Sequence, residues 1–413
     1  MRAIKTSNVA AYLGLLFISI FMIQTARTIY IDAYSQPGTN LDELGYAINT
    51  GIGGLLTIYA LRKRLLLFAP LMVIAVFLIF LLINVEFNTD ESFKAVFLSR
   101  YGMFTWFAIG LWMALSIRSM RAKLDAGSSK YLQKLAIFTI YLSSLPIAWL
   151  MQKYLSDRVL SHSYQIVASN ATIFICISIL ALHAFVKGKS VGPASSNFPV
   201  YFLIFLSSFL VYVVVLMQST SILAFWIVSL PIILISLTSR SGLAVRLVVI
   251  CIVLLLVYWI SVEFFLADVL ENTRFKGAND GLSSFNSVQT RQELLPGFFA
   301  QFEVAPIFGD FRAEVTAGFQ KGQYIHSLLL SLLTHSGVLG FFLMLLSWFM
   351  LYFNRMKSTV PADANNSLAF RLFLVISGLA SIYAFFSWAP FWFFLGYMCV
   401  KAYRPMPTGG LCK

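Results

Sequence analysis

A histidine stands at the end of the longest hydrophilic stretch of the chain. This residue, His326, opens the apolar segment that follows the stretch. It would have access to water there, and imidazole titrates near neutral pH, as a general base requires. A histidine that only sits at a membrane interface would occupy the same place. His335 follows nine residues later, on roughly the opposite face of a helix. We take His326 as a candidate general base and expect His335 to pack or to form a hydrogen bond.

Arginines suggest a second chemistry, the binding of an anion. Arg27 and Arg100 lie near the expected outer ends of two apolar segments. There they could either extend to the membrane interface or line a cavity that holds an anion. Arg274 and Arg291 lie in the hydrophilic stretch, among a denser set of ionisable residues. The guanidinium fork suits phosphate because it makes paired, charge-assisted hydrogen bonds.

Other chemistries find no signature in the sequence. The chain has no GxxxxGK[ST], GxGxxG or GxSxG motif, and its four cysteines form no CxxC pair or Cys/His cluster. These absences leave nucleotide hydrolysis, serine-hydrolase chemistry and a zinc site without support. Outer acidic residues such as Asp32, Asp42 and Glu43 show no specific metal-ligand spacing. We therefore predict no metal and no cofactor.

The elements that position these residues are expected to be membrane helices. Of the 413 residues, 59% are hydrophobic and only 11% are charged, with a mean hydropathy of +0.82. Soluble domains carry about 25% charged residues, and one span needs about 20 apolar residues. The fold class predicted is therefore all-α, a polytopic transmembrane helix bundle of about twelve spans. The apolar runs lie at 8–30, 44–61, 65–84, 94–117, 131–151, 165–186, 198–217, 219–237, 242–261, 324–353, 368–387 and 388–401, the last of them short and aromatic.

Lysine and arginine set the expected orientation of the bundle. Alternate breaks between the runs hold nineteen of them, whereas the other short breaks hold three, Lys94, Lys153 and Arg158. Cationic loops stay in the cytoplasm, so the net charge of +13 is attributed to cytoplasmic loops and not to nucleic-acid binding. The nineteen are Arg2, Lys5, Arg62, Lys63, Arg64, Arg118, Arg121, Lys123, Lys130, Lys187, Lys189, Arg240, Arg246, Arg355, Lys357, Arg371, Lys401, Arg404 and Lys413. Both termini are thus predicted to be cytoplasmic.

This orientation places one long hydrophilic stretch, residues 262–323, on the outer side. Loops of such length are uncommon and are often functional. Its second half, Leu294–Phe302, is apolar and aromatic and could form a short helix at the membrane surface. We therefore divide the chain into a transmembrane bundle of about nine helices (1–261), a catalytic loop (262–323) and C-terminal transmembrane helices (324–413).

Four short motifs in and after this loop follow one another in a definite order. They are Thr290-Arg291-Gln292-Glu293, Ala305-Pro306-Ile307-Phe308-Gly309, Tyr324-Ile325-His326-Ser327 and Ser336-Gly337-Val338-Leu339-Gly340. In this order the chain resembles the O-antigen ligase/polymerase superfamily of bacterial envelope glycan enzymes. That family shows an arginine before a short amphipathic segment, a Pro-x-x-Gly turn, a His-Asn pair that opens a helix, and a Gly-x-x-Gly. The motifs cover about 50 residues, and beyond them only the architecture matches.

Two departures from the family pattern stand out. The usual His-Asn pair is His326-Ser327 here, so any role of the asparagine passes to a serine or is lost. The family's outer Ser-Arg pair would correspond to Ser239-Arg240, which the predicted topology places inside. Either the span count is wrong there or Arg240 is a cytoplasmic flank.

The resemblance implies a metal-independent, inverting glycosyltransferase similar to those of the GT-C class. Its donor would be an undecaprenyl-diphosphate-linked oligosaccharide in the outer leaflet of the bacterial inner membrane. Arg291 would neutralise the diphosphate leaving group, with Arg27, Arg100, Arg240 and Arg274 as further candidates for binding it. His326 would take the proton from an acceptor hydroxyl. A flippase and a chain-length regulator are partners that the family implies, together with membrane lipid, whereas nucleic acid is not one.

Three functions remain open. The first is polymerisation of lipid-linked repeat units into O-antigen or a related surface polysaccharide of lipopolysaccharide biosynthesis, which we favour because polymerase sequences diverge most. The second is ligation of finished glycan to lipid A core. The third, from another class, is a twelve-span secondary transporter, for which Pro70, Pro146 and Pro231 are candidate helix breaks.

Overall fold

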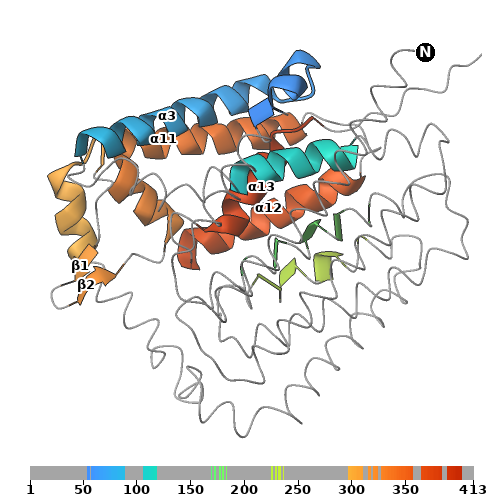
Figure 1. Cartoon of the computed structure of the whole chain (residues 1–413). Coiled ribbons are helices and arrows are strands. Elements are labelled where there is room, and N and C mark those ends of the chain that lie inside the picture. Colours follow the sequence, from blue (N-terminus) through green and yellow to red (C-terminus); the bar gives the residue numbers. More distant parts are fainter. Residues whose placement is uncertain are drawn as a thin grey trace, which may run out of the picture.

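The computed structural model describes residues 54–55, 57–88, 106–118, 296–309, 315–317, 320–323, 327–356, 364–383 and 388–401, with further helical positions between 169 and 183 and between 225 and 236. This part of the chain is helical apart from one short antiparallel hairpin, β1 (Val315–Ala317) and β2 (Gln320–Gln323). Figure 1 shows the long helices lying alongside one another, with the hairpin on the side of the bundle where α3 ends.

The helix α3 (Phe68–Asn88) forms from a run that has no charged residue before Glu86. Pro70 falls in its first turn, where the missing N–H costs nothing. One face is buried, through Leu71, Ile74, Phe77 and Leu81. The other face carries exposed large apolar side chains at intervals of three or four residues: Phe68, Met72, Val76, Ile79 and Ile83. The helix thus presents an apolar stripe outward as well as inward.

The helix α11 (Leu328–Met356) packs along α3 and consists of two parts. Gly337 separates them with φ 61° and ψ −171°, which is not a helical conformation. Residues 328–355 are long and apolar enough to span a membrane, whereas Phe68–Leu81, Trp106–Arg118 and Ser367–Ser381 are shorter apolar helices. The second part of α11 repeats the pattern of α3, with exposed apolar side chains at Val338, Phe342, Leu346, Phe349 and Phe353.

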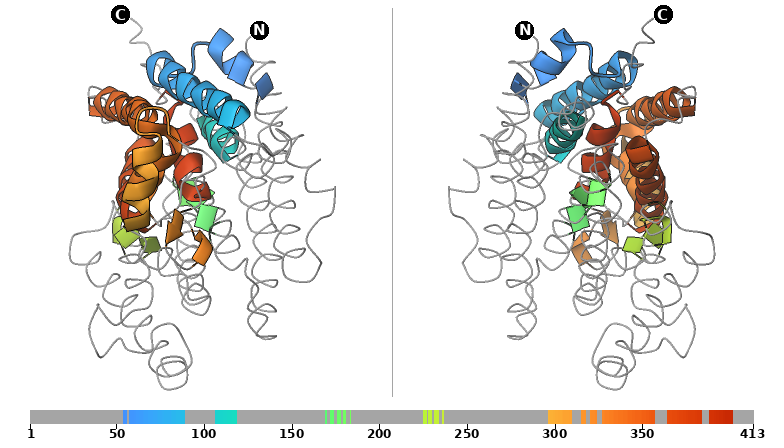
Figure 2. Two further views of the ribbon diagram at one scale, coloured as in Figure 1. Left: turned by 90° about the vertical axis from the view of Figure 1, so that its left-hand side faces the viewer. Right: turned by 90° about the vertical axis from the view of Figure 1, so that its right-hand side faces the viewer.

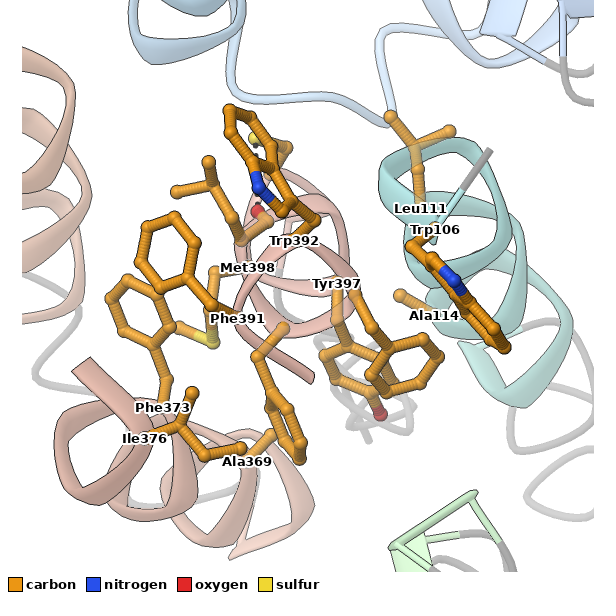
Figure 3. Close-up of a cluster of buried hydrophobic side chains, with 14 of the residues drawn as sticks. Trp106, Leu111, Ala114, Ala369, Phe373, Ile376, Phe391, Trp392, Tyr397 and Met398 are labelled. Carbon is orange, nitrogen blue, oxygen red and sulfur yellow. Dashed lines mark hydrogen bonds between the residues drawn. The ribbon is translucent and has the colours of Figure 1, made fainter. Parts of the chain in front are cut away.

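A short helix, α13 (Ala389–Met398), lies at the centre of the described bundle. Its residues from Pro390 to Met398 are all buried. Trp392 stacks on Phe77 of α3 at 6.4 Å between ring centroids, and Phe391 meets both Trp348 of α11 and Phe373 of α12 (Ala364–Tyr383). Figure 3 shows the aromatic side chains of α13 between α12 and the helix Trp106–Arg118. Neighbours on every side explain why this helix has no polar face.

Two glycines bring α13 and the helix Trp106–Arg118 into backbone contact. A Cβ atom at Gly110 would lie 1.9 Å from the carbonyl oxygen of Phe393, and one at Gly396 would lie 2.0 Å from that of Phe107. Each helix therefore places a glycine against the backbone of the other. Small residues at crossings of this kind are typical of helices packed within a bilayer.

Cationic side chains gather at one end of the described bundle. Leu66, which follows the exposed Arg62–Arg64 turn, pairs with Val400 just after α13. Arg355 donates hydrogen bonds to the carbonyls of Met398 (3.1 Å) and Val400 (2.9 Å). Arg118 donates to the carbonyl of Lys401. Four cationic breaks that the sequence analysis assigns to the cytoplasmic side thus meet at one end of the described bundle. They are the breaks at Arg62–Arg64, Arg118, Arg355 and Lys401.

Most predicted helices within the described residues are confirmed, with shifted ends. Residues 65–84, 324–353, 368–387 and 388–401 correspond to α3, α11, α12 and α13. Part of 94–117 is the helix Trp106–Arg118, and described positions in 44–61, 165–186 and 219–237 are helical. The predicted runs 8–30, 131–151, 198–217 and 242–261 lie outside the described residues, as do both termini.

Candidate active site

Ser327 begins the helix that follows His326, and it does so as an N-cap. Its hydroxyl oxygen accepts a hydrogen bond from the backbone N–H of Leu330 (3.4 Å), three residues on. The same hydroxyl donates to the carbonyl of Ser381 (2.6 Å), near the end of α12. Serine and asparagine are both favoured N-caps, so either residue can begin a helix here. The hydrogen bonds of Ser327 therefore describe a structural role in joining α11 to α12.

Residues 296–304 form a short helix, which we call the loop helix. This agrees with the helix predicted for Leu294–Phe302. Its Phe298 is 4% exposed and packs with Phe302 against Leu330 and Leu333 in the first part of α11. Phe298 and Phe302 are stacked, at 6.0 Å between ring centroids. The loop helix is therefore held on the part of α11 that starts at Ser327.

The turn after the loop helix contacts α11 where α11 breaks. We call this contact, between residues 305–309 and Gly337, the Gly309–Gly337 junction. The carbonyls of Pro306 and Ile307 accept hydrogen bonds from the backbone N–H groups of Val338 (2.9 Å) and Leu339 (3.2 Å). A helix break leaves just such N–H groups without a partner in their own helix. The turn therefore supplies the acceptors that α11 itself lacks.

Both glycines of the junction are required by its geometry. Gly309 has φ 76°, and a Cβ atom there would lie 2.4 Å from the backbone nitrogens of Ser336 and Gly337. Gly337 has φ 61°, and its Cβ atom would lie 2.2 Å from the carbonyl oxygen of Ile307. Positive φ is strained for L residues other than glycine. The atoms that either Cβ atom would meet belong to the backbone, which cannot move aside as a flexible side chain can. Any larger residue at either position must separate the turn from α11.

The junction lies beside apolar side chains of α3. Phe308 is 57% exposed and its ring centroid lies 6.3 Å from that of Phe80, a residue of α3 eight positions before Asn88. Eight helical residues span about 12 Å. The turn is therefore level with the apolar stripe of α3 and not beyond its end. Backbone at such a level must satisfy its hydrogen bonds within the protein if lipid surrounds it, and the bonds to Val338 and Leu339 do so.

The first part of α11 has a buried polar face. Ser327, Ser331, Thr334 and His335 are all buried, and at about 100° per residue they fall within roughly one third of the helix circumference. Thr334 donates to carbonyls of its own helix, those of Leu330 (3.2 Å) and Ser331 (3.1 Å). The hydroxyls of Ser327 and Thr334 are therefore already bonded to backbone. The burial of His335 agrees with the packing role predicted for it.

The residues predicted to carry the chemistry lie outside the described part of the chain. They are His326, Arg291, Arg27, Arg100, Arg240 and Arg274. Two of them adjoin described segments in the sequence: His326 directly precedes the N-cap Ser327, and Arg291 comes five residues before the loop helix. Within the described ranges, no group of three or more His, Cys, Asp or Glu residues could hold a metal ion.

Sequence reasoning missed that the Pro-x-x-Gly and Gly-x-x-Gly motifs contact each other. A signal was available, since each motif places a glycine where a break or turn would need one, but nothing in a single sequence pairs the two. The chain was also compared with models of protein families, with curated proteins and with solved structures, and no match was found in any of the three.

Proposed function

We propose that this protein is a bacterial inner-membrane glycosyltransferase that polymerises undecaprenyl-diphosphate-linked oligosaccharide repeat units on the periplasmic side. The observation that carries the proposal is the Gly309–Gly337 junction. It joins the second and fourth of the motifs on which the family resemblance rests, which are separated in the sequence by a hairpin and the first part of α11. The third motif ends at Ser327, the N-cap of the same helix. Motifs that meet in space are expected if they serve one site.

A membrane location is supported by the apolar surface of the described helices. The exposed stripes of α3 and α11 each run over sixteen residues, from Phe68 to Ile83 and from Val338 to Phe353, or about 24 Å. Water-soluble monomers rarely expose contiguous apolar surface of this extent. The hydrocarbon core of a bilayer is about 30 Å thick, so the stripes suit lipid.

The arrangement of charge supports the proposed orientation. Arg62–Arg64, Arg118, Arg355 and Lys401 gather at one end of the bundle, and a cationic end is expected in the cytoplasm. Figure 1 shows the loop helix and the hairpin on the side where α3 ends, away from its start, and Figure 2 views the bundle from that side and from the opposite side. The proposed reaction, with a donor in the outer leaflet, needs the loop on that side.

In the proposed mechanism His326 accepts a proton from an acceptor hydroxyl, which attacks the anomeric carbon and inverts it. The bond from the anomeric carbon to the diphosphate breaks, and the diphosphate leaves on its polyprenyl carrier. Arg291 neutralises the charge that develops on the leaving group, with Arg27, Arg100, Arg240 and Arg274 as further candidate ligands.

The secondary transporter is a second candidate, because one observation favours it. Transporters use broken helices whose exposed N–H groups face an anionic substrate, and α11 is broken at Gly337. The N–H groups of Val338 and Leu339, however, are occupied by the carbonyls of Pro306 and Ile307. We therefore prefer the enzyme.

The test is the pattern of surface polysaccharide in a strain whose chromosomal copy is replaced by variants. His326→Ala should abolish the long-chain ladder while the protein stays in the membrane. Arg291→Ala should do nearly the same, and Arg291→Lys should restore only part, because lysine is a point charge and not a fork. Glu303→Ala, at an exposed position of the loop helix, is the matched control and should leave the ladder intact. Unchanged ladders in the His326 and Arg291 variants would remove the proposed site.

Deletion of the chain separates the candidate functions. A core that carries a single repeat unit, with the ladder gone, indicates a polymerase. A bare core with accumulated lipid-linked polymer indicates the ligase that attaches glycan to lipid A core. A normal ladder combined with loss of uptake or export of a solute would favour the transporter.

A further inference from the structure

Residues 296–309 attach to α11 at two places, one on each side of its break. Before the break, Phe298 of the loop helix packs on Leu330 and Leu333. At and after the break, Pro306 and Ile307 bond the N–H groups of Val338 and Leu339. The turn itself is closed by a hydrogen bond from the N–H of Gly309 to the carbonyl of Ala305 (2.8 Å). One short segment thus bridges the two parts of α11.

This bridge fixes the angle between the two parts. Gly337 has no Cβ atom and a backbone conformation outside the helical region, so the glycine alone does not set the direction of the first part. The second part is held by α3, against which α11 packs. The first part is held by the hydrogen bond of Ser327 to Ser381 and by the bridge. Leu328 and Leu332 also anchor the first part in the main core, so the junction acts with these contacts to set where the start of α11 lies relative to the loop helix.

We propose that Gly309 and Gly337 are positioning residues for the proposed glycosyl transfer. Their backbone contact holds the helix start that adjoins His326 at a set distance from the segment that follows Arg291. This inference rests on the proposed function. It assigns a role in that function to two residues that touch neither donor nor acceptor. Reactions between held groups lose about 100-fold in rate when a group is displaced by about 1 Å. A Cβ atom 2.2 Å from the Ile307 oxygen requires at least such a displacement.

The kinetic test uses purified full-length protein in detergent and lipid-linked repeat units as the donor. Gly337→Ala and Gly309→Ala should lower kcat per folded molecule by about 100-fold, with KM for the donor within about threefold of the unmodified value. Gly378→Ala is the matched control, since nothing lies within 4 Å of a Cβ atom there, and its kcat should not change. A merely structural role would reduce the amount of folded protein and leave kcat per folded molecule intact. That result would overturn the proposal.

A cross-linking test examines the junction without an activity assay. In a background without the four native cysteines, Ile307→Cys and Leu339→Cys create two exposed thiols on bonded backbone segments. Copper phenanthroline should oxidise the two thiols to a disulfide in native membranes, because a disulfide requires Cα atoms within about 7 Å of each other. The control pair, Ile307→Cys with Phe353→Cys, should not react, because Phe353 lies fourteen residues or about 21 Å further along α11. Adding Gly337→Ala to the first pair should slow the formation of the disulfide, because the displaced backbones no longer meet its narrow geometry.

The outcomes of the two tests bear on the positioning contact and on the proposed function separately. No cross-link between positions 307 and 339, or one that forms equally fast in the Gly337→Ala background, would overturn the junction as a positioning contact. The cross-linked 307–339 protein folds with both glycines present, so it also tests the inference if the alanine variants do not fold. Its kcat should match that of the uncross-linked pair, and a loss of activity on cross-linking would overturn the idea of a fixed contact. Absence of any glycan product from the unmodified protein, with the cross-link present, would count against the proposed function alone.

Discussion

Alanine at Gly110 is expected to displace α13 from the centre of the bundle. The added Cβ atom would lie 1.9 Å from the carbonyl oxygen of Phe393 and 2.7 Å from its carbonyl carbon. Ordinary contacts of a Cβ atom begin near 3.4 Å, so the two backbones must separate by about 1.5 Å. Because α13 is buried on all sides, a shift of that size also disturbs the aromatic contacts of Phe391 and Trp392 with α3, α11 and α12.

The size of the effect follows from two opposing contributions. Overpacking of a core costs about 1–3 kcal/mol, and the upper end applies at Gly110 because both clashing atoms belong to the backbone. Alanine is favoured over glycine within a helix by up to about 1 kcal/mol. The free energy of unfolding of Gly110→Ala should therefore fall by about 2 kcal/mol. At Gly378 only the favourable contribution exists, since no atom lies within 4 Å of the added Cβ, so Gly378→Ala should gain up to about 1 kcal/mol.

The measurement is equilibrium unfolding of the purified protein in detergent with increasing fractions of dodecyl sulfate, followed by tryptophan fluorescence. Trp392 and Trp348 belong to the affected region and should report its loss. Gly396→Ala is a second test of the same crossing, because its Cβ atom would lie 2.0 Å from the carbonyl oxygen of Phe107. If Gly110→Ala unfolded at the same point as Gly378→Ala, the close crossing of the two helices would be refuted.

Two further predictions concern hydrogen bonds to helix ends. Ser327→Ala should lower the free energy of unfolding by about 1–2 kcal/mol, because it removes the N-cap of α11 and the hydrogen bond to Ser381. Ser327→Asn should retain most of this stability, because asparagine is also a favoured N-cap. Equal stability of the two variants in the same unfolding assay would contradict the capping role. Arg355→Ala should cost about 1–3 kcal/mol, since it leaves the carbonyls of Met398 and Val400 without this donor. Arg355→Lys should recover only part of that loss, and full recovery would show that charge alone matters there.

The positions of the helices could be predicted because the chain alternates long apolar runs with short charged breaks. The charged residues that bound the runs of α3 and α11 mark the ends of these helices to within a few residues. The shortness of α13 was also predicted, and its ten residues confirm it. The break in α11 was not predicted, because a lone glycine in an apolar run is compatible with a continuous helix. Its cause lies in the turn 305–309, a contact between distant residues.

The candidate site, like the fold, could be predicted from the sequence only in part. The cap at Ser327 could be predicted from its residue type, because serine is a favoured N-cap, although the family pattern has asparagine at this position. The contact between Gly309 and Gly337 depends on how the loop folds back, which no spacing in one sequence specifies. The roles of His326 and Arg291, as well as those of the other arginines, stay predictions.

The break at Gly337 has a consequence for how the chain is made. In a growing chain the turn 305–309 emerges from the ribosome before any residue of α11, so its carbonyls exist when the second part of α11 is made. In the membrane location proposed above, unpaired N–H groups at Val338 and Leu339 would cost several kcal/mol in hydrocarbon. In that location, insertion of the segment and docking of the turn should therefore occur as one event.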